Sequence, residues 1–224
     1  MSEQEWNWDG AEREFERAIE LNANCAVAHQ GRGLLKSYRR QHDEAIESMK
    51  RALELDPLSL PFNRNTAVAL EMAGRYDEAL EVAKRATEMD PDYMFVHFIQ
   101  GIIYTMKSMY EEAFAEFELE ERSFGGKYPL LEASRATAYA RSGRTRDAER
   151  ILDDLRSAYS HSLLSPFCVA QVCFALGRKD EGFEWLERAY EERDRWLRLV
   201  GLLDKPSMAG GDPRLAALLK KMGL

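Results

Sequence analysis

Small and apolar residues recur along this chain at spacings of three and four, and short polar breaks separate the apolar runs. Ala45, Met49 and Ala52 have this spacing, which places them on one face of an α-helix. Glycines stand at several breaks, where they suit a helix C-terminus with positive φ, whereas Pro57 and Pro91 end other runs. The pattern predicts amphipathic helices joined by short turns.

The pattern also repeats along the chain. Small residues recur every 34 residues and, after one step of 35, continue at the same interval: Ala11, Ala45, Ala79, Ala113, Ala148 and Gly182. A second column marks the tight turn inside each unit: Arg40, Gly74, Ser108, Gly143 and Gly177. The extra residue falls within 124–129, where Gly125 and Gly126 can absorb it. Each unit is therefore expected to be a helix, a tight turn, a second helix and a break.

Two segments carry a more specific signature. They are Asp43-Glu44-Ala45-Ile46 followed by Arg51-Ala52-Leu53-Glu54-Leu55-Asp56-Pro57, and Gly74-Arg75-Tyr76-Asp77-Glu78-Ala79-Leu80. With the 34-residue period, they resemble the tetratricopeptide repeat (TPR) from about Trp8 to about Arg193. The resemblance implies an all-α fold, a right-handed superhelical α-solenoid of helix-turn-helix units with a C-terminal capping helix. The chain departs from the family at Glu120, where Ala is preferred, and in the Trp column, which reads His29, Asn63, His97, Glu132 and Pro166.

Both ends of the chain suggest a narrower resemblance. The segments 8–22 and 212–224 are similar to the TPR region found C-terminal to bacterial serine/threonine kinases, adenylate cyclases and winged-helix regulators. That resemblance implies a regulatory or oligomerisation segment of a bacterial signalling protein. The chain itself contains no kinase catalytic loop, phosphate-binding glycine loop or DNA-reading domain.

The repeats predict a single solenoid domain over residues 1–224. Residues 1–25 form a partial first repeat, 26–194 form five full repeats, and 195–224 form a C-terminal cap whose last helix begins with Asp212 and Pro213. The partial repeat lacks most of its first helix, so Trp6 and Trp8 are expected to cover the exposed end. The alternatives are a dimer contact or a piece of a longer protein, and the oligomeric state stays open.

Composition limits the function further. The chain has 224 residues, of which 45% are hydrophobic and 31% charged, which is typical of a globular protein and not of a disordered one. Its formal net charge of −8 argues against binding nucleic acid through phosphate neutralisation. The most apolar stretch, 93–106, is shorter than the roughly 20 residues of a membrane span. With no signal peptide and three unpatterned cysteines, we expect a cytoplasmic protein.

Residues that could carry chemistry do not form a recognisable set. His29 and His97 lie in equivalent positions two units apart, too far to share a metal ion. Cys168 and Cys173 are five residues apart, a poor spacing for a helical metal pair. We therefore predict no enzymatic activity, no cofactor and no metal.

A binding role is the remaining hypothesis, since the resemblance implies a concave groove lined by the first helix of each unit. Carrying the groove columns over gives seven candidate residues, with a protein or peptide as the expected partner: Tyr38, Arg64, Val68, Phe95, Phe98, Ile102 and Met106. Further members of the columns are Val27, Gln30, Leu34, Met72, Phe167, Gln171 and Phe174. Their apolar character favours an amphipathic helix or apolar peptide over a carboxylate-terminated one. The alternative is that a shifted register makes these side chains core.

Overall fold

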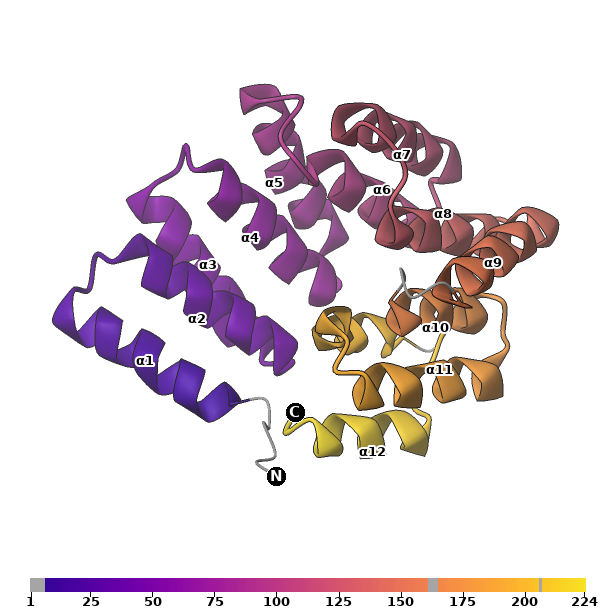
Figure 1. Cartoon of the computed structure of the whole chain (residues 1–224). Coiled ribbons are helices and arrows are strands. Elements are labelled where there is room, and N and C mark those ends of the chain that lie inside the picture. Colours follow the sequence, from indigo (N-terminus) through magenta and orange to yellow (C-terminus); the bar gives the residue numbers. More distant parts are fainter. Residues whose placement is uncertain (1–6, 161–164, 206) are drawn as a thin grey trace. The chain divides into compact units, whose positions relative to one another are not determined.

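The computed structural model describes residues 7–160, 165–205 and 207–224, and the chain there is built of helices with no strand. The predicted all-α fold is confirmed (Figure 1). The helices are α1 (Trp8–Leu21), α2 (Ala26–Tyr38), α3 (His42–Leu55), α4 (Leu60–Met72), α5 (Tyr76–Met89), α6 (Val96–Met106), α7 (Tyr110–Phe124), α8 (Pro129–Arg141), α9 (Thr145–Ser160), α10 (Pro166–Ala175), α11 (Lys179–Glu191), the 3₁₀ helix η1 (Arg195–Leu203) and α12 (Pro213–Lys221).

Consecutive helices pair across tight turns, as the turn column predicts. The pairs α2 with α3, α4 with α5, α8 with α9 and α10 with α11 pack closely along their lengths. Each turn holds one residue with positive φ: 61° at Arg40, 75° at Gly74, 62° at Ser108, 82° at Gly143 and 74° at Gly177. Arg40 and Ser108 adopt this left-handed conformation without being glycine, which costs backbone energy.

The contacts divide the chain into two compact units. The first contains residues 1–99 and 219–224, of which 7–99 and 219–224 are described, and the second contains residues 100–218. In the first unit α2 packs against α1, α3 and α4. Trp6 lies outside the described residues. Trp8 is half-buried, with its ring 6.2 Å from that of Tyr38, and its Nε1 donates a 2.7 Å hydrogen bond to the carbonyl of Met222.

The columns of small residues are buried where helices approach closely. Ala45, Ala52 and Ala79 have no exposed surface. A large side chain fills the space beside another small residue: a Cβ placed on Gly101 would lie 2.4 Å from the ring of Phe117, which is fully buried. Small residues thus let the helix axes approach, and large ones fill the adjoining space, as the repeat predicts.

The lengthened turn after α7 accommodates both the extra residue and the unexpected Glu120. Gly125 and Gly126 have φ values of 80° and 150°, which end α7 in a glycine turn. The turn brings Tyr128 back over α7, so that its hydroxyl donates a 3.0 Å hydrogen bond to Glu120, which is 1% exposed. Burial, together with the Glu120 carboxylate, raises the pKa of Tyr128. A buried acid is therefore accepted at this family-atypical position because it has a hydroxyl partner.

One buried carboxylate organises the last helix pair of the second unit. Asp194 accepts hydrogen bonds from the hydroxyl of Ser165, from the backbone N–H of Phe167 at 3.1 Å and from that of Trp196 at 2.9 Å. It thereby caps the start of α10 and the start of η1 together. The predicted C-terminal cap thus begins with this 3₁₀ segment.

The last helix begins as the sequence predicts. Asp212 accepts from the backbone N–H of Arg214 at 3.0 Å, so it is the N-cap, and Pro213 is the first helical residue. The Arg214 guanidinium pairs with Asp212 and lowers the pKa of that carboxyl to about 2. Arg214 also pairs with Asp180 at 2.8 Å and lies 4.1 Å from the ring centroid of Phe183, which fixes the start of α12 against α11.

Candidate functional site

In the first unit, α4 leaves one line of side chains open to solvent. Arg64, Val68 and Met72 are half-buried, at the spacing of four that keeps them on one face, while the rest of the helix after Pro61 is buried. The neighbouring helix α2, which packs against α4, leaves Leu34 and Tyr38 half-buried. These are residues of the predicted groove columns. Their role in binding stays a prediction.

Arg64 has an unusual environment for a half-buried cation. Its guanidinium lies 5.8 Å from the ring centroid of Tyr93, and its Nε donates a 3.1 Å hydrogen bond to Asn65. It forms no ion pair with any residue that the structure describes. A cation beside an aromatic ring and without a carboxylate partner can receive an anionic group from outside.

The aromatic candidates of the first unit lie where α6 begins. Phe95 precedes the helix and has a φ of 68°, a strained value for a bulky residue. Its ring is 6.2 Å from that of Phe98 in an edge-to-face arrangement. Phe98 is only 8% exposed, whereas Phe95 is half-buried. Phe95 is therefore the more accessible of the two.

The remaining candidates belong to the second unit. Ile102 and Met106 are half-buried on α6. On α10, however, Phe167 and Phe174 are 1% exposed, and the ring of Phe174 stacks edge-to-face on Phe183 at 5.0 Å. These two phenylalanines are core residues, so the groove columns do not extend to them. The apolar-core alternative holds for these two residues of α10, which packs against α8, α9, α11 and η1, whereas Gln171 of the same column is half-buried.

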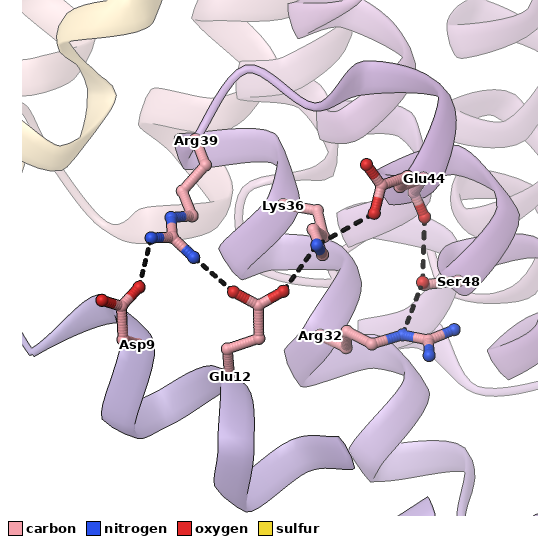
Figure 2. Close-up of polar contacts among 7 residues, drawn as sticks. All are labelled: Asp9, Glu12, Arg32, Lys36, Arg39, Glu44 and Ser48. Atoms are coloured by element: carbon pink, nitrogen blue, oxygen red, sulfur yellow. Dashed lines mark hydrogen bonds and ion pairs between the residues drawn. The ribbon is translucent and has the colours of Figure 1, made fainter. Parts of the chain in front are cut away.

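A cluster of charges between α1, α2 and α3 was not predicted from the sequence (Figure 2). The Glu12 carboxylate accepts from Lys36 Nζ at 2.5 Å with one oxygen and from Arg39 with the other. Lys36 also pairs with Glu44 at 2.9 Å, and Arg39 pairs with Asp9. Burial lowers the pKa of Lys36, but its hydrogen bonds to Glu12 and Glu44 outweigh that effect and raise the pKa above its ordinary value.

The column in which the TPR signature places tryptophan holds buried polar side chains in the first unit. His29, Asn63 and His97 each bond the carbonyl of the residue six positions earlier, at 2.9 Å to Ala23, 3.0 Å to Pro57 and 2.8 Å to Pro91. All three are buried. Each side chain thus ties the turn between two consecutive repeats to the helix that follows the turn. The identical spacing of the three residues was visible in the sequence, but their bonding partners were not.

The described residues form no metal-binding cluster. Within that part of the chain, no three His, Cys, Asp or Glu side chains lie close enough together to hold a metal ion. Burial raises the pKa of the Cys168 thiol to about 12 and that of Cys173 to about 11, so both are unreactive as nucleophiles at neutral pH. The described helices also include none that is long and apolar enough to cross a membrane.

Comparison with known families decides the classification. A family model for the tetratricopeptide repeat matches residues 31–94 and 134–195, which together exceed half of the chain. The chain belongs to the TPR family. The matched ranges cover both units, so each of them is built of TPR repeats. A search of curated protein sequences finds no significant match.

Solved structures of other TPR proteins are similar to this one. PilW, a widely conserved type IV pilus biogenesis factor, has a TM-score of 0.64 and 20% identity over 87% of this chain and 90% of that chain. A tetratricopeptide repeat protein from Parabacteroides merdae has a TM-score of 0.61 and 15% identity over 97% and 93%. YrrB, a TPR protein with an unusual peptide-binding site, has a TM-score of 0.50 and 17% identity over 79% and 82%. At these identities the likeness concerns the fold. The narrower resemblance to TPR regions of kinases, cyclases and regulators stays a prediction.

Proposed function

We propose that this TPR protein is a non-enzymatic interaction module that binds an apolar or amphipathic partner segment along the first helices of its repeats. The observation that carries the proposal is the half-open line Arg64, Val68 and Met72 on α4, beside α2. Apolar side chains along this line offer contact area, and Arg64 offers a cation without an ion pair in the described chain. Segments of this kind bind by placing apolar residues at helical spacing into such a surface.

Arg64 adds a preference to this proposal. An acidic residue in the partner, next to its apolar residues, would pair with the guanidinium above Tyr93. A charge-assisted hydrogen bond of this kind contributes about 1.5–3 kcal/mol when it is shielded from water. The existence of a peptide-binding site in the TPR protein YrrB is consistent with a peptide as the partner.

Selection from a random peptide library, followed by calorimetry, tests the proposal. Val68→Glu is a better perturbation than a change at Phe98, because Val68 is half-buried whereas Phe98 is 8% exposed and its replacement would disturb the core. Ala115→Glu on an exposed position of α7 is the matched control. We expect selected peptides to lose about tenfold or more in affinity for Val68→Glu and to keep it for the control.

Arg64→Ala tests the preference for an acidic residue. Selected peptides that contain Asp or Glu should lose affinity for this variant. The same peptides with Asn or Gln in place of the acidic residue should lose no further affinity when Arg64 is replaced. If the library yields no binder, or if binders are indifferent to both substitutions, the assignment to the α4 face is wrong.

A further inference from the structure

The turns that join consecutive repeats in the first unit expose apolar side chains. The three turns, with their flanking residues, are 20–27, 54–61 and 88–95, and we call them the acidic edge. In the described part of the chain, six large apolar side chains are more than a third exposed, and five of them lie in these turns: Leu21, Val27, Leu58, Met89 and Met94. Leu58 is 76% exposed. Exposed apolar residues gathered in this way, and not scattered singly, are typical of an interaction surface.

The charges of the acidic edge are all negative. None of the three segments contains Lys or Arg, and together they contain Glu20, Glu54, Asp56, Glu88, Asp90 and Asp92. Glu20 and Glu54 are paired with Arg17 and Arg51. Asp56, Glu88 and Asp90 have no ion pair with any residue of the described ranges. The edge therefore presents apolar groups next to uncompensated carboxylates.

Contacts between neighbouring repeats place the three turns along one edge of the unit, as Figure 1 shows for the loops α1–α2, α3–α4 and α5–α6. Arg51, near the end of α3, donates a 3.0 Å hydrogen bond to Asn24 in the first turn. Arg64, in the second turn of α4, lies 5.8 Å from the ring of Tyr93 in the third turn. The three turns thus follow one another along one border of the unit.

We infer that the acidic edge docks a cationic amphipathic segment of a partner protein. Its apolar face would cover Leu58 and Met94, while its Lys or Arg residues would pair with Asp56, Glu88 and Asp90. An acidic segment would be repelled by the same carboxylates, and two copies of this chain meeting edge to edge would bring like charges together. This surface adjoins the α4 face of the proposed function at Arg64, whose guanidinium lies beside Tyr93, but it does not include Val68 and Met72, which lie further along α4.

Fluorescence anisotropy with a defined probe tests the inference on the full chain. The probe is a labelled peptide of about 18 residues in which Leu recurs at spacings of three and four and Lys fills the other positions, so that a helix has one apolar and one cationic face. Its controls are a peptide with the same composition in scrambled order and one with Glu in place of Lys. We expect the ordered Leu–Lys peptide to bind, and the other two to bind at least about tenfold more weakly.

Two double variants separate apolar contact from charge. Leu58→Ser/Met94→Ser should weaken binding by about tenfold or more, because each side chain loses buried apolar area in the complex. Asp56→Asn/Glu88→Gln should weaken it by about fivefold and reduce its dependence on salt. Glu47→Gln/Glu81→Gln removes the same charge from exposed positions of α3 and α5 outside the edge, and it should change binding by less than about twofold.

Several outcomes would overturn the inference. Equal losses with the two charge variants would show attraction to the overall negative field, and equal binding of the scrambled peptide would show that amphipathic order is irrelevant. Loss of binding with Val68→Glu but not with the edge variants would move the peptide to the α4 face, which would leave the proposed function standing. Failure of the ordered peptide to bind, or self-association of the chain that the edge variants abolish, would also contradict it.

Discussion

Replacing Glu12 by glutamine tests whether ion pairs, more than apolar packing, hold α1 against the rest of the first unit. None of the residues of α1 is fully buried, whereas the equivalent helices α3 and α5 each bury several side chains completely. The substitution keeps the size of the side chain and removes the charge that Lys36 and Arg39 share (Figure 2).

The magnitude follows from the geometry of the cluster. The side chains of Glu12 and Lys36 are 16% and 11% exposed, so their interaction is poorly screened by water. Removing one member of a buried ion pair costs about 3–5 kcal/mol, but here each cation keeps a second partner, in Glu44 and in Asp9. We therefore expect Glu12→Gln to lower the free energy of opening α1 by about 2–3 kcal/mol. Helix α1 would then open roughly 30- to 150-fold more often.

Hydrogen exchange measured by mass spectrometry on the peptide 8–21 reports that opening directly. The control is Glu20→Gln on the same helix, which removes a pair with Arg17 whose side chains are 66% and 64% exposed. This exposed pair contributes less than about 1 kcal/mol, so exchange should rise by less than about fivefold. If Glu12→Gln accelerates exchange no more than Glu20→Gln does, the charge cluster does not hold α1. Faster exchange of the same size in α8 and α10 would point to global unfolding instead.

Three further predictions concern the second unit. Ser108→Gly should stabilise the chain by about 0.5–1 kcal/mol, because its φ of 62° is strained for serine, and chemical denaturation that showed no gain would contradict this. Tyr128→Phe should cost about 1–3 kcal/mol in thermal unfolding, since buried Glu120 loses a hydroxyl partner, while an unchanged midpoint would show that this bond contributes nothing. A thiol reagent at pH 8 should label one cysteine of three in the native chain and all three in urea, because burial raises the pKa of Cys168 to about 12 and that of Cys173 to about 11. Since these thiols ionise more easily once unfolded, stability should also fall as pH rises above about 9, and rapid native labelling of all three would refute the burial.

The sequence was sufficient for the fold because the repeat fixes a residue type at each close approach of helices. The turn column placed Arg40 and Ser108 at the same position as the glycines, and the structure gives them the positive φ that was expected of the glycines. The glycine pair at 125–126 was correctly expected to absorb the extra residue.

Other features could not be obtained in this way. Helical spacing tells which residues share a face but not what covers that face, so Phe167 and Phe174 were assigned to a groove and proved to be core. The pairing of Glu12 with Lys36 joins residues of two helices, and their long side chains give no periodic signal. On α4 the spacing of four coincides with a half-buried face, and the role of that face in binding stays a prediction.

The double cap made by Asp194 has a consequence for synthesis of the chain. The residues at the start of α10 that it bonds are Ser165 and Phe167, which precede it by 29 and 27 positions. While the chain leaves the ribosome, α10 emerges without this cap, whose loss costs a helix about 0.5–2 kcal/mol. Only when Asp194 has emerged, after all of α11, can the first turn of α10 and the 3₁₀ segment be completed in the same step. The first helix of the last repeat is therefore completed only after the second helix of that repeat has been translated.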